Sequence, residues 1–366
     1  MSAGPILIMA GGTGGHVFPA LAVAQALQHE ARQVVWVGTR QGLEAGIVPD
    51  TGIPMEWISV HGLRGKGLVS WLLAPFKLIY ALSQAVGVMR RQRPAAVLGM
   101  GGFVAGPGGV AAGLLRKPLI VHEQNAVAGL TNRVLAKFAR TVLEAFPHSF
   151  PGDGHARTVG NPVRPEIARM DAPTQRFEGR SGAPRLLVLG GSQGARALNI
   201  AVPRALALME RDLRPEVWHQ AGERTISVAR DVYRDSQVEA QIDPFIDDMA
   251  AAYAWADFVV CRAGALTVFE LAAAGIGAVL VPYPSAVDDH QTLNARYLTD
   301  RGAALLLPES ELTSERLAEL LQRLVSDPAV RLRMASAARE LATPRAVDLI
   351  RDAVLLATGA KEHGDG

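Results

Sequence analysis

The 366-residue chain has only one cysteine, Cys261, and aromatic side chains make up only 5% of it. A single cysteine excludes an intramolecular disulfide and a cysteine-rich metal site, so we expect a reducing compartment. Basic and aromatic residues are nowhere interleaved into a stacking surface, which argues against nucleic acid as a partner. The N-terminus has neither a charged segment nor a cleavage site, so no signal peptide is expected.

Two familiar phosphate-binding motifs are also missing. A G-x-G-x-x-G fingerprint beginning at Gly12 would need glycine at position 17, where Val17 stands. The second apolar strand ends in VWVGTR, without the acidic residue that would hold a ribose hydroxyl. No G-K-[ST] follows any of the glycine-rich turns, which excludes a Walker A loop. The glycine turns still present backbone N–H groups at helix starts, an arrangement that suits phosphate.

Short apolar strands alternate with helical patterns along the whole chain: PILIMA, QVVWVG, AAVLGMGG, PLIVHEQ, RLLVLGG, FVVCRAG and AVLVPYP. This alternation predicts an α/β protein with parallel sheets covered by helices. IMAGGTGGH before PALAVAQAL resembles LVLGGSQGA before LNIAVPRAL, about 180 residues later. We therefore predict two Rossmann-like domains that bind ligands at the carboxyl ends of their strands, linked by the Pro-, Gly- and Arg-rich segment 159–184.

The net charge of +2 hides a strong asymmetry. Residues 1–160 contain 14 Lys and Arg against 7 Asp and Glu, whereas the remainder contains 23 against 28. No acidic residue occurs from Trp57 through His122, although eight basic residues do. A basic N-terminal half favours an anionic partner such as phosphate or a membrane surface.

An almost continuous apolar segment, GLVSWLLAPFKLIYALSQAVGVM, lies within the basic half. Pro75 and Lys77 near its centre make it a poor membrane-spanning helix. It is either a core helix or an exposed apolar patch flanked by basic residues that contacts anionic lipid. The charge asymmetry favours the lipid-binding patch, which we place around Lys66, Trp71, Leu72, Phe76 and Ile79.

Polar residues gather where several predicted strands end. His16 follows the first glycine turn, where it either acts as a general base or only hydrogen-bonds the turn. Arg262, beside a helix start, offers a cation and backbone donors to a diphosphate. Glu270, further along that helix, either holds both hydroxyls of a ribose or is a surface glutamate. The adjacent acids at 288–289 are weak evidence for a metal.

Taken together, these motifs resemble the MurG family of bacterial N-acetylglucosaminyltransferases. The resemblance runs from about Ile6 to Leu356 through GGTGGHVFPA, GMGGFVAGPGG, HEQNAVAGLTN, GNPVR, GGSQGARALN, DDMAAAYAWAD and CRAGALTVFELAAAG. It implies a GT-B fold, with two Rossmann-like domains facing a deep cleft. Residues 1–161 would form the acceptor- and membrane-binding domain and 162–342 the UDP-GlcNAc-binding domain. A helix at about 343–358 would return to the first domain, and 359–366 would be a disordered tail.

The resemblance also implies an activity. The enzyme would move GlcNAc from UDP-GlcNAc to the 4-hydroxyl of the muramyl sugar of lipid I, the undecaprenyl-diphosphate-linked MurNAc-pentapeptide. Inversion at the anomeric carbon would yield lipid II and UDP for peptidoglycan synthesis at the cytoplasmic face of the bacterial inner membrane. It implies no cofactor and no metal. The competing functions are another GT-B lipid glycosyltransferase, a UDP-GlcNAc 2-epimerase, and a non-catalytic membrane-associated scaffold that binds nucleotide.

The family's site residues carry over position by position. His16 becomes the favoured general base, with Glu123 as a competing candidate. The positions that match the acceptor-diphosphate site are Gly12, Gly14, Gly15, Gly101, Gly102 and Phe103. The positions that match the donor site are Thr13, Gly14, Gly15, Asn125, Arg164, Ser192, Phe245, Ile246, Arg262, Ala265, Leu266, Thr267, Glu270, His290 and Gln291. The chain departs from the family at His290, where glutamine is common, and at Phe103, where some relatives have tyrosine.

Overall fold

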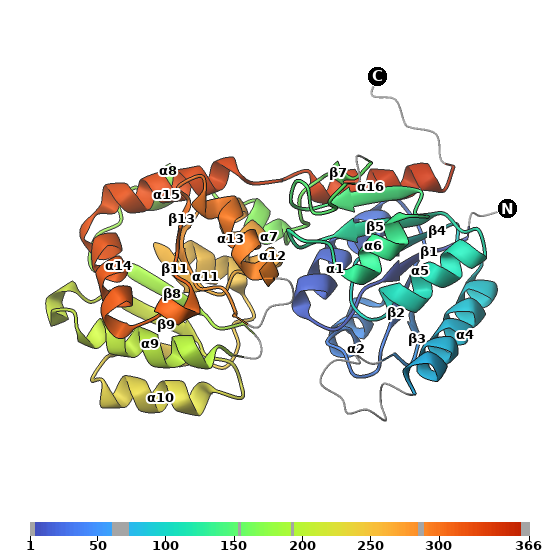
Figure 1. Cartoon of the computed structure of the whole chain (residues 1–366). Helices are drawn as coiled ribbons and strands as arrows, with labels where there is room; N and C mark the ends of the chain where they lie inside the picture. Colours follow the sequence, from blue (N-terminus) through green and yellow to red (C-terminus); the bar gives the residue numbers. More distant parts are fainter. Residues whose placement is uncertain (1–3, 61–72, 153–154, 192–193, 285–288, 360–366) are drawn as a thin grey trace, which may run out of the picture. The chain divides into compact units, whose positions relative to one another are not determined.

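The computed structural model describes residues 4–60, 73–152, 155–191, 194–284 and 289–359 (Figure 1). The chain folds into two compact units. Unit 1 comprises Met1–Val163 and Pro344–Gly366, and unit 2 comprises Arg164–Thr343. The predicted tail at 359–366 lies outside the described residues, except for Gly359.

Unit 1 contains a seven-stranded parallel sheet in the order β3-β2-β1-β4-β5-β6-β7. Its strands are β1 (Ile6–Met9), β2 (Val34–Gly38), β3 (Met55–Trp57), β4 (Ala96–Gly99), β5 (Leu119–Glu123), β6 (Thr141–Glu144) and β7 (Arg157–Thr158). Its helices are α1 (Gly14–His29), α2 (Glu44–Ile47), η1 (Pro49–Thr51), α4 (Ala74–Gln92), α5 (Ala105–Leu114), α6 (Leu130–Ala136) and α16 (Ala346–Ala357).

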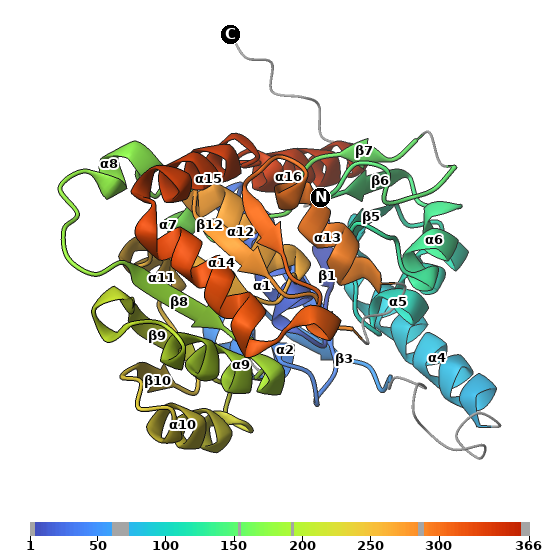
Figure 2. The same cartoon turned by 60° about the vertical axis from the view of Figure 1, so that its left-hand side comes forward.

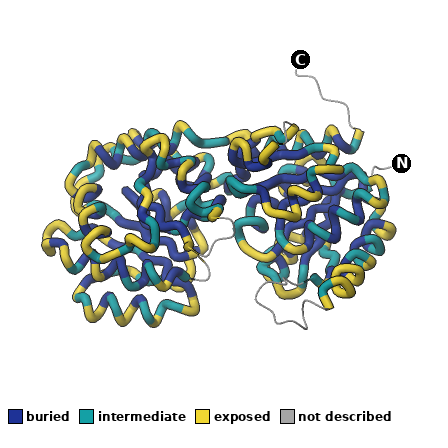
Figure 3. Tube along the Cα trace, in the orientation of Figure 1, coloured by how far each residue is buried: buried dark blue, intermediate teal, exposed yellow. Residues whose placement is uncertain are grey.

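The central strand β1 shows why this sheet is covered on both faces. All four of its residues are buried, as expected for a strand in the middle of a parallel sheet. Ile6 and Ile8 pack with α1 and α16 in one apolar core, whereas Leu7 and Met9 pack with α4, α5 and α6 in another. Figure 3 shows the strands dark blue inside the unit and exposed residues along the helices.

Unit 2 contains a six-stranded parallel sheet in the order β10-β9-β8-β11-β12-β13. Its strands are β8 (Arg185–Leu189), β9 (Glu216–Gln220), β10 (Gln241–Asp243), β11 (Phe258–Cys261), β12 (Gly277–Leu280) and β13 (Ala304–Leu306). Its helices are α7 (Pro165–Ala168), α8 (Pro173–Phe177), α9 (Arg196–Ala207), η2 (Arg211–Leu213), α10 (Ile226–Asp235), α11 (Met249–Trp255), α12 (Ala265–Ala274), α13 (His290–Thr299), η4 (Glu309–Glu311), α14 (Ser314–Ser326) and α15 (Pro328–Glu340).

The helices of unit 2 also cover both faces of its sheet. Leu186 and Val188 of β8 share a core with α9, α10 and α14, and α9 and α10 lie side by side in Figure 1 and Figure 2. Leu187 and Leu189 point to the opposite face and are buried there too. Most of the 159–184 segment, predicted as a link, belongs to unit 2, where α7 and α8 pack on α12 and α15.

The two sheets share one topology, because each begins with a central strand and then changes direction after its third strand. This order is that of the Rossmann fold, so the predicted pair of Rossmann-like α/β domains is confirmed. Ligands of such sheets bind at the carboxyl ends of the strands where the order reverses. These places are β1 and β4 in unit 1, and β8 and β11 in unit 2.

Candidate functional site

The two glycine-rich turns of unit 1 lie directly against each other, because β1 and β4 are neighbours in the sheet. The first turn contains Gly11 and Gly12, and the second contains Gly101 and Gly102. A Cβ atom on Gly102 would overlap the backbone oxygen of Gly11, so only glycine permits this approach. Gly12, Gly101 and Gly102 all have positive φ, which glycine adopts at little cost.

His16, in the first turn of α1, lies where three loops meet. A Cβ atom on Gly101 would come within 2.6 Å of His16 Nδ1 and 2.8 Å of Cε1, so the imidazole packs against the Gly101 backbone. His16 Nδ1 makes a short hydrogen bond with Gln124 Oε1, just after β5. The imidazole is half-buried. The structure therefore places a partly accessible histidine at the predicted ligand-binding edge of the sheet.

Glu123, at the end of β5, is buried, and both of its carboxylate oxygens accept hydrogen bonds. Its Oε1 accepts hydrogen bonds from the backbone N and Nδ2 of Asn125 at 2.9 and 3.2 Å. Its Oε2 accepts hydrogen bonds from the backbone N of Gly129 at 3.2 Å and from Nδ2 of Asn132 at 2.8 Å. Four donors on a side chain that is 4% exposed hold the loop after β5 in place.

His122 is completely buried beside these residues. Its Nε2 donates a hydrogen bond to the backbone oxygen of Gly160 at 3.0 Å. Burial lowers the pKa of His122 to about 4, so its imidazole is neutral at neutral pH. His122 therefore anchors Gly160, three residues before the end of unit 1.

Glu44 on α2 is a residue of this site that the sequence analysis missed. It is fully buried, and its carboxylate accepts hydrogen bonds from the Gly12 N at 2.9 Å, the Thr39 N at 2.8 Å and Thr39 Oγ1 at 2.9 Å. A Cβ atom on Gly11 or Gly38 would come within 2.6 or 2.7 Å of its side chain. The nearby glycines thus make room for a carboxylate that holds the first glycine turn.

The other positions predicted on these two turns are the acceptor positions Gly12, Gly14, Gly15 and Phe103 and the donor position Thr13. The N–H of Gly12 is engaged by Glu44, whereas Gly14 and Gly15 open α1, where N–H groups have no intrahelical acceptor. Thr13 is the N-cap residue of α1, with no side-chain cap hydrogen bond. Phe103, on the second glycine turn, is 60% exposed.

Glu270 on α12 is the buried acid of unit 2. Its Oε1 accepts hydrogen bonds from Nε and Nη2 of Arg164 at 3.1 and 2.8 Å, and its Oε2 accepts one from the Tyr253 hydroxyl at 3.2 Å. Burial raises the pKa of Glu270, while Arg164 acts in the opposite direction. With only 4% of Glu270 exposed, the surface-glutamate alternative is excluded. The sequence did not indicate Tyr253 as a site residue.

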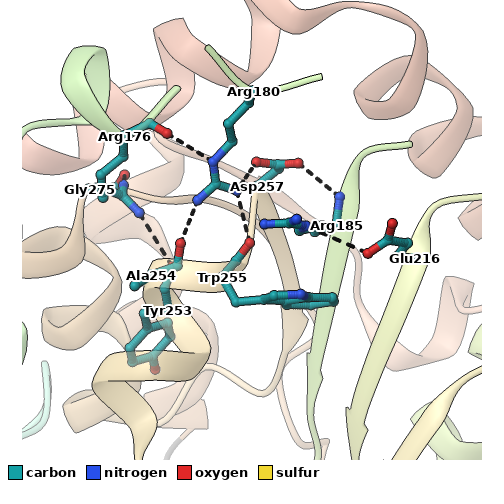
Figure 4. A network of polar contacts seen from close by, with 9 residues as sticks. All are labelled: Arg176, Arg180, Arg185, Glu216, Tyr253, Ala254, Trp255, Asp257 and Gly275. Atoms are coloured by element: carbon teal, nitrogen blue, oxygen red, sulfur yellow. Dashed lines mark hydrogen bonds and ion pairs between the residues drawn. The ribbon is translucent and has the colours of Figure 1, made fainter. Parts of the chain in front are cut away.

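A network of arginines fixes the helix that carries Tyr253 (Figure 4). Arg176 donates hydrogen bonds to the backbone oxygens of Tyr253 at 3.3 Å and Gly275 at 2.5 Å, at the ends of α11 and α12. Arg180 donates to two more carbonyls at the end of α11 and forms an ion pair with Asp257. Cations at helix C-termini satisfy carbonyls that lack intrahelical partners. The network thereby joins α11 to α12 and positions Tyr253 beside Glu270.

Arg262, the cation predicted to bind a diphosphate, already contacts other groups of the protein. Its Nη1 donates to the backbone oxygens of Val281 and Pro282, both at 3.2 Å. Its guanidinium forms an ion pair with Glu309 and lies 5.5 Å from the ring centroid of Tyr283. The structure thus adds a counter-charge, Glu309, that the sequence pattern did not reveal.

The other predicted donor residues also lie at the ends of strands. Ala265, Leu266 and Thr267 form the first turn of α12, whose N–H groups have no intrahelical acceptor. Phe245 is 44% exposed after β10, and Ile246 next to it is buried.

Two further donor positions, His290 and Gln291, begin α13. The Gln291 Oε1 accepts a hydrogen bond from the backbone N of Tyr283 at 2.9 Å. Ser192 lies outside the described residues. Among the residues that the structure describes, no group of three or more His, Cys, Asp or Glu side chains could hold a metal ion.

The N-terminal half of α4, with the residue before it, carries an exposed apolar face. We define this apolar face as Leu73, Phe76, Ile79 and Tyr80, which are 46, 71, 64 and 57% exposed and lie on one side by helical periodicity. Leu78, which is 58% exposed, lies on the opposite side. Lys66, Trp71 and Leu72, predicted to join it, lie outside the described residues. Among the described helices, none has the length and apolar character needed to cross a membrane.

Comparison with known proteins adds independent findings. Residues 6–144 match the glycosyltransferase family 28 N-terminal domain, and residues 185–350 match the family 28 C-terminal domain. A UDP-N-acetylglucosamine--N-acetylmuramyl-(pentapeptide) pyrophosphoryl-undecaprenol N-acetylglucosamine transferase from Nitrosococcus oceani is 61% identical, covering 92% of this chain and 94% of the relative. A protein of the same name from Xanthomonas euvesicatoria is 53% identical over 99% of this chain and 82% of its own length.

Solved structures agree with these sequence matches. The crystal structure of MurG from Acinetobacter baumannii is 42% identical, with a TM-score of 0.82 over 96% of this chain and 99% of that one. The calicheamicin glycosyltransferase CalG4 is 18% identical with a TM-score of 0.66, over 97% and 99% of the two chains. At that identity, the second match shows the fold alone.

Proposed function

The chain belongs to the MurG family within glycosyltransferase family 28, and on that premise we propose that it transfers GlcNAc from UDP-GlcNAc to undecaprenyl-diphosphate-linked MurNAc-pentapeptide (lipid I). The products are lipid II and UDP, and the process served is peptidoglycan synthesis. The observation that carries the proposal is the 61% identity over nearly the whole chain to a relative whose name states this transfer.

On the acceptor side, His16 is the general base. Its imidazole is half-buried at the junction of both glycine turns, so a sugar hydroxyl can reach it. Glu123 is less suited to this role, because four hydrogen-bond donors already occupy its two oxygens. The acceptor diphosphate binds the backbone amides of the two turns, at Gly14, Gly15, Gly101, Gly102 and Phe103. Gly12 contributes through its backbone conformation, because its N–H is engaged by Glu44.

On the donor side, unit 2 holds UDP-GlcNAc. The first-turn amides of α12, at Ala265, Leu266 and Thr267, stabilise the diphosphate with help from Arg262. Glu270 holds the ribose hydroxyls, and its pairing with Arg164 keeps its carboxylate oriented.

The other donor contacts lie on neighbouring loops. Phe245 and Ile246 flank the base, Ser192 lies near the phosphates, and His290 and Gln291 meet the GlcNAc hydroxyls. The remaining predicted donor positions, Thr13 and Asn125, belong to unit 1.

The reaction is a single in-line displacement. The 4-hydroxyl oxygen of the acceptor forms a bond to the anomeric carbon while the bond from that carbon to the diphosphate oxygen breaks. The hydroxyl proton passes to His16, and the bonding electron pair leaves with UDP. Attack from the opposite face inverts the anomeric carbon, by the same logic as an inverting glycosidase with a sugar hydroxyl in place of water.

We propose that the apolar face of α4 rests on the anionic inner face of the bacterial inner membrane. Its four large apolar side chains are exposed over two turns, more than an isolated surface residue would explain. The absence of acidic residues from Trp57 through His122 favours binding to anionic lipid. This contact brings the site to a polyprenyl-linked acceptor. Flotation with phosphatidylglycerol vesicles tests it: Phe76→Ser with Ile79→Ser should reduce binding, and unchanged binding would refute the contact.

The deciding experiment measures UDP release from UDP-GlcNAc with and without a lipid I analogue, for the native protein and His16→Ala. The expected result is acceptor-dependent release with a new GlcNAc–muramyl product. His16→Ala should lose about 10²–10⁴-fold in turnover while still binding UDP. Release or epimerisation without acceptor would transfer support to hydrolase or 2-epimerase chemistry. Tight UDP binding with no turnover would support the scaffold.

A further inference from the structure

A residue outside the predicted site list, Gln124, contacts the proposed base directly. Its Oε1 makes a short hydrogen bond with His16 Nδ1, although the two residues are 108 positions apart. The Gln124 side chain is 2% exposed, so solvent does not compete for this contact. The imidazole also packs against the backbone of Gly101, which lies close to the same Nδ1 atom. The ring therefore contacts both a buried amide and a glycine.

The loop around Gln124 is fixed on both sides. The preceding residue, Glu123, is held by four hydrogen bonds. The following residue, Asn125, accepts a hydrogen bond at its backbone oxygen from Ser149 Oγ at 2.9 Å. A side chain on such a loop can act as a rigid orienting group rather than following the imidazole as it moves.

The chemistry of the contact decides which ring nitrogen carries the proton. An amide oxygen only accepts hydrogen bonds, so the nitrogen facing it must be the one that bears hydrogen. We propose that Gln124 is a positioning residue that holds His16 with its proton on Nδ1 and leaves the Nε2 lone pair free to take the acceptor hydroxyl proton. This inference rests on the proposed function, in which His16 is the base.

In the reaction, the hydroxyl proton moves to Nε2 as the hydroxyl oxygen bonds to the anomeric carbon and UDP leaves with the electron pair. The Nδ1–H bond to Gln124 is kept throughout, so the ring does not need to turn. Among the described residues, His122 interacts electrostatically with His16, Glu123 directly precedes Gln124, and Glu44 holds the turn before α1. His122 is neutral and both acids are engaged by hydrogen-bond donors, so the neutral amide is the group that sets the tautomer.

The first test is spectroscopic and independent of turnover. The full chain, labelled with ¹⁵N in its nine histidines, is studied by long-range ¹H–¹⁵N correlation, with His16 assigned from the signal lost in His16→Ala. We expect His16 to be protonated on Nδ1 in the native protein and to lose that preference in Gln124→Leu. Protonation on Nε2 in the native protein, or an unchanged tautomer in Gln124→Leu, would overturn the inference.

The second test is kinetic. Gln124→Leu should lower kcat by about 10- to 100-fold, less than His16→Ala, with the KM for UDP-GlcNAc within about twofold of native. Gln124→Glu keeps an acceptor oxygen and should retain most of kcat at high pH. Its negative charge favours the imidazolium, so the acidic limb of the kcat/KM profile should move to higher pH. A limb that stays in place would show that residue 124 does not contact the imidazole that acts as the base, and would overturn the inference.

A matched control is Gln92→Leu, the same substitution on α4, where Nε2 of Gln92 donates to Glu56 Oε1 at 2.8 Å. It should leave both the His16 tautomer and kcat unchanged. The two proposals fail separately: if His16→Ala retains turnover while the Nδ1 tautomer is found, the base assignment falls and the tautomer assignment stands.

Discussion

The contact between Gly101 and His16 allows one prediction to be worked out in detail. In Gly101→Ala, the new Cβ atom would lie 2.6 Å from His16 Nδ1, whereas ordinary contact begins at 3.4 Å. The imidazole must therefore move by about 0.8 Å, the difference between these two distances. A displacement of about 1 Å in a reacting group can cost about 10²-fold in rate, so we expect kcat to fall by about that factor. Because the proposed donor residues are largely in unit 2, the Kd for UDP should stay near its native value.

Gly101→Ala also strains the backbone, so a control variant with similar backbone strain is needed. Gly101 has a φ of +94°, where alanine costs about 1–2 kcal/mol. Gly52 has a φ of +74°, but its Cβ atom would meet nothing within 4 Å. Gly52→Ala should therefore lose similar stability yet keep native turnover. The assay is acceptor-dependent UDP release, with urea unfolding for both variants. Native kcat in a folded Gly101→Ala protein would refute the packing argument.

Three further predictions follow from the buried polar groups. In Glu44→Gln, an amide NH₂ group faces N–H donors that now bind a carboxylate oxygen. The free energy of unfolding, measured by urea titration, should fall by about 2–3 kcal/mol. A change below about 0.5 kcal/mol would contradict this. The pKa of His122 is about 4 when folded against 6.5 as the ordinary value, so the unfolded chain takes up the proton first as pH falls. Stability should therefore drop from pH 6.5 toward 4, by up to about 3 kcal/mol, and His122→Asn should remove that part of the slope in paired denaturation series. Glu270→Gln should raise the Kd for UDP by about 10- to 100-fold in calorimetry, and an unchanged Kd would exclude it from the ribose site.

Much of the fold could be predicted because its signals are local. Each of the seven short apolar runs predicted as strands became a strand, and the repeated glycine turns follow β1 and β8. A parallel sheet buries both faces of its strands, so its strands appear as continuous apolar runs that are easy to recognise.

The site was only partly predictable, because its contacts join distant positions. His16 stands out beside its glycine turn, but its partner Gln124 is 108 residues away. Glu44 reaches Gly12 across 32 positions, and Arg164 reaches Glu270 across 106. No local pattern indicates such pairs, because periodicity and spacing describe neighbours along the chain and not across a sheet.

The sequence by itself therefore determined the α/β class and the two Rossmann-like halves, and it indicated the strand ends at which we propose that ligands bind. Hydrophobic periodicity and glycine positions determine structure over a few neighbouring residues, so both can be recognised directly in the sequence. Only the tertiary structure decided that Glu123 is enclosed by donors, that Glu270 is paired with Arg164, and that Gln124 meets His16. Those outcomes depend on which loops the sheet brings together and on how much water it excludes, because burial and proximity set the chemistry of a polar group.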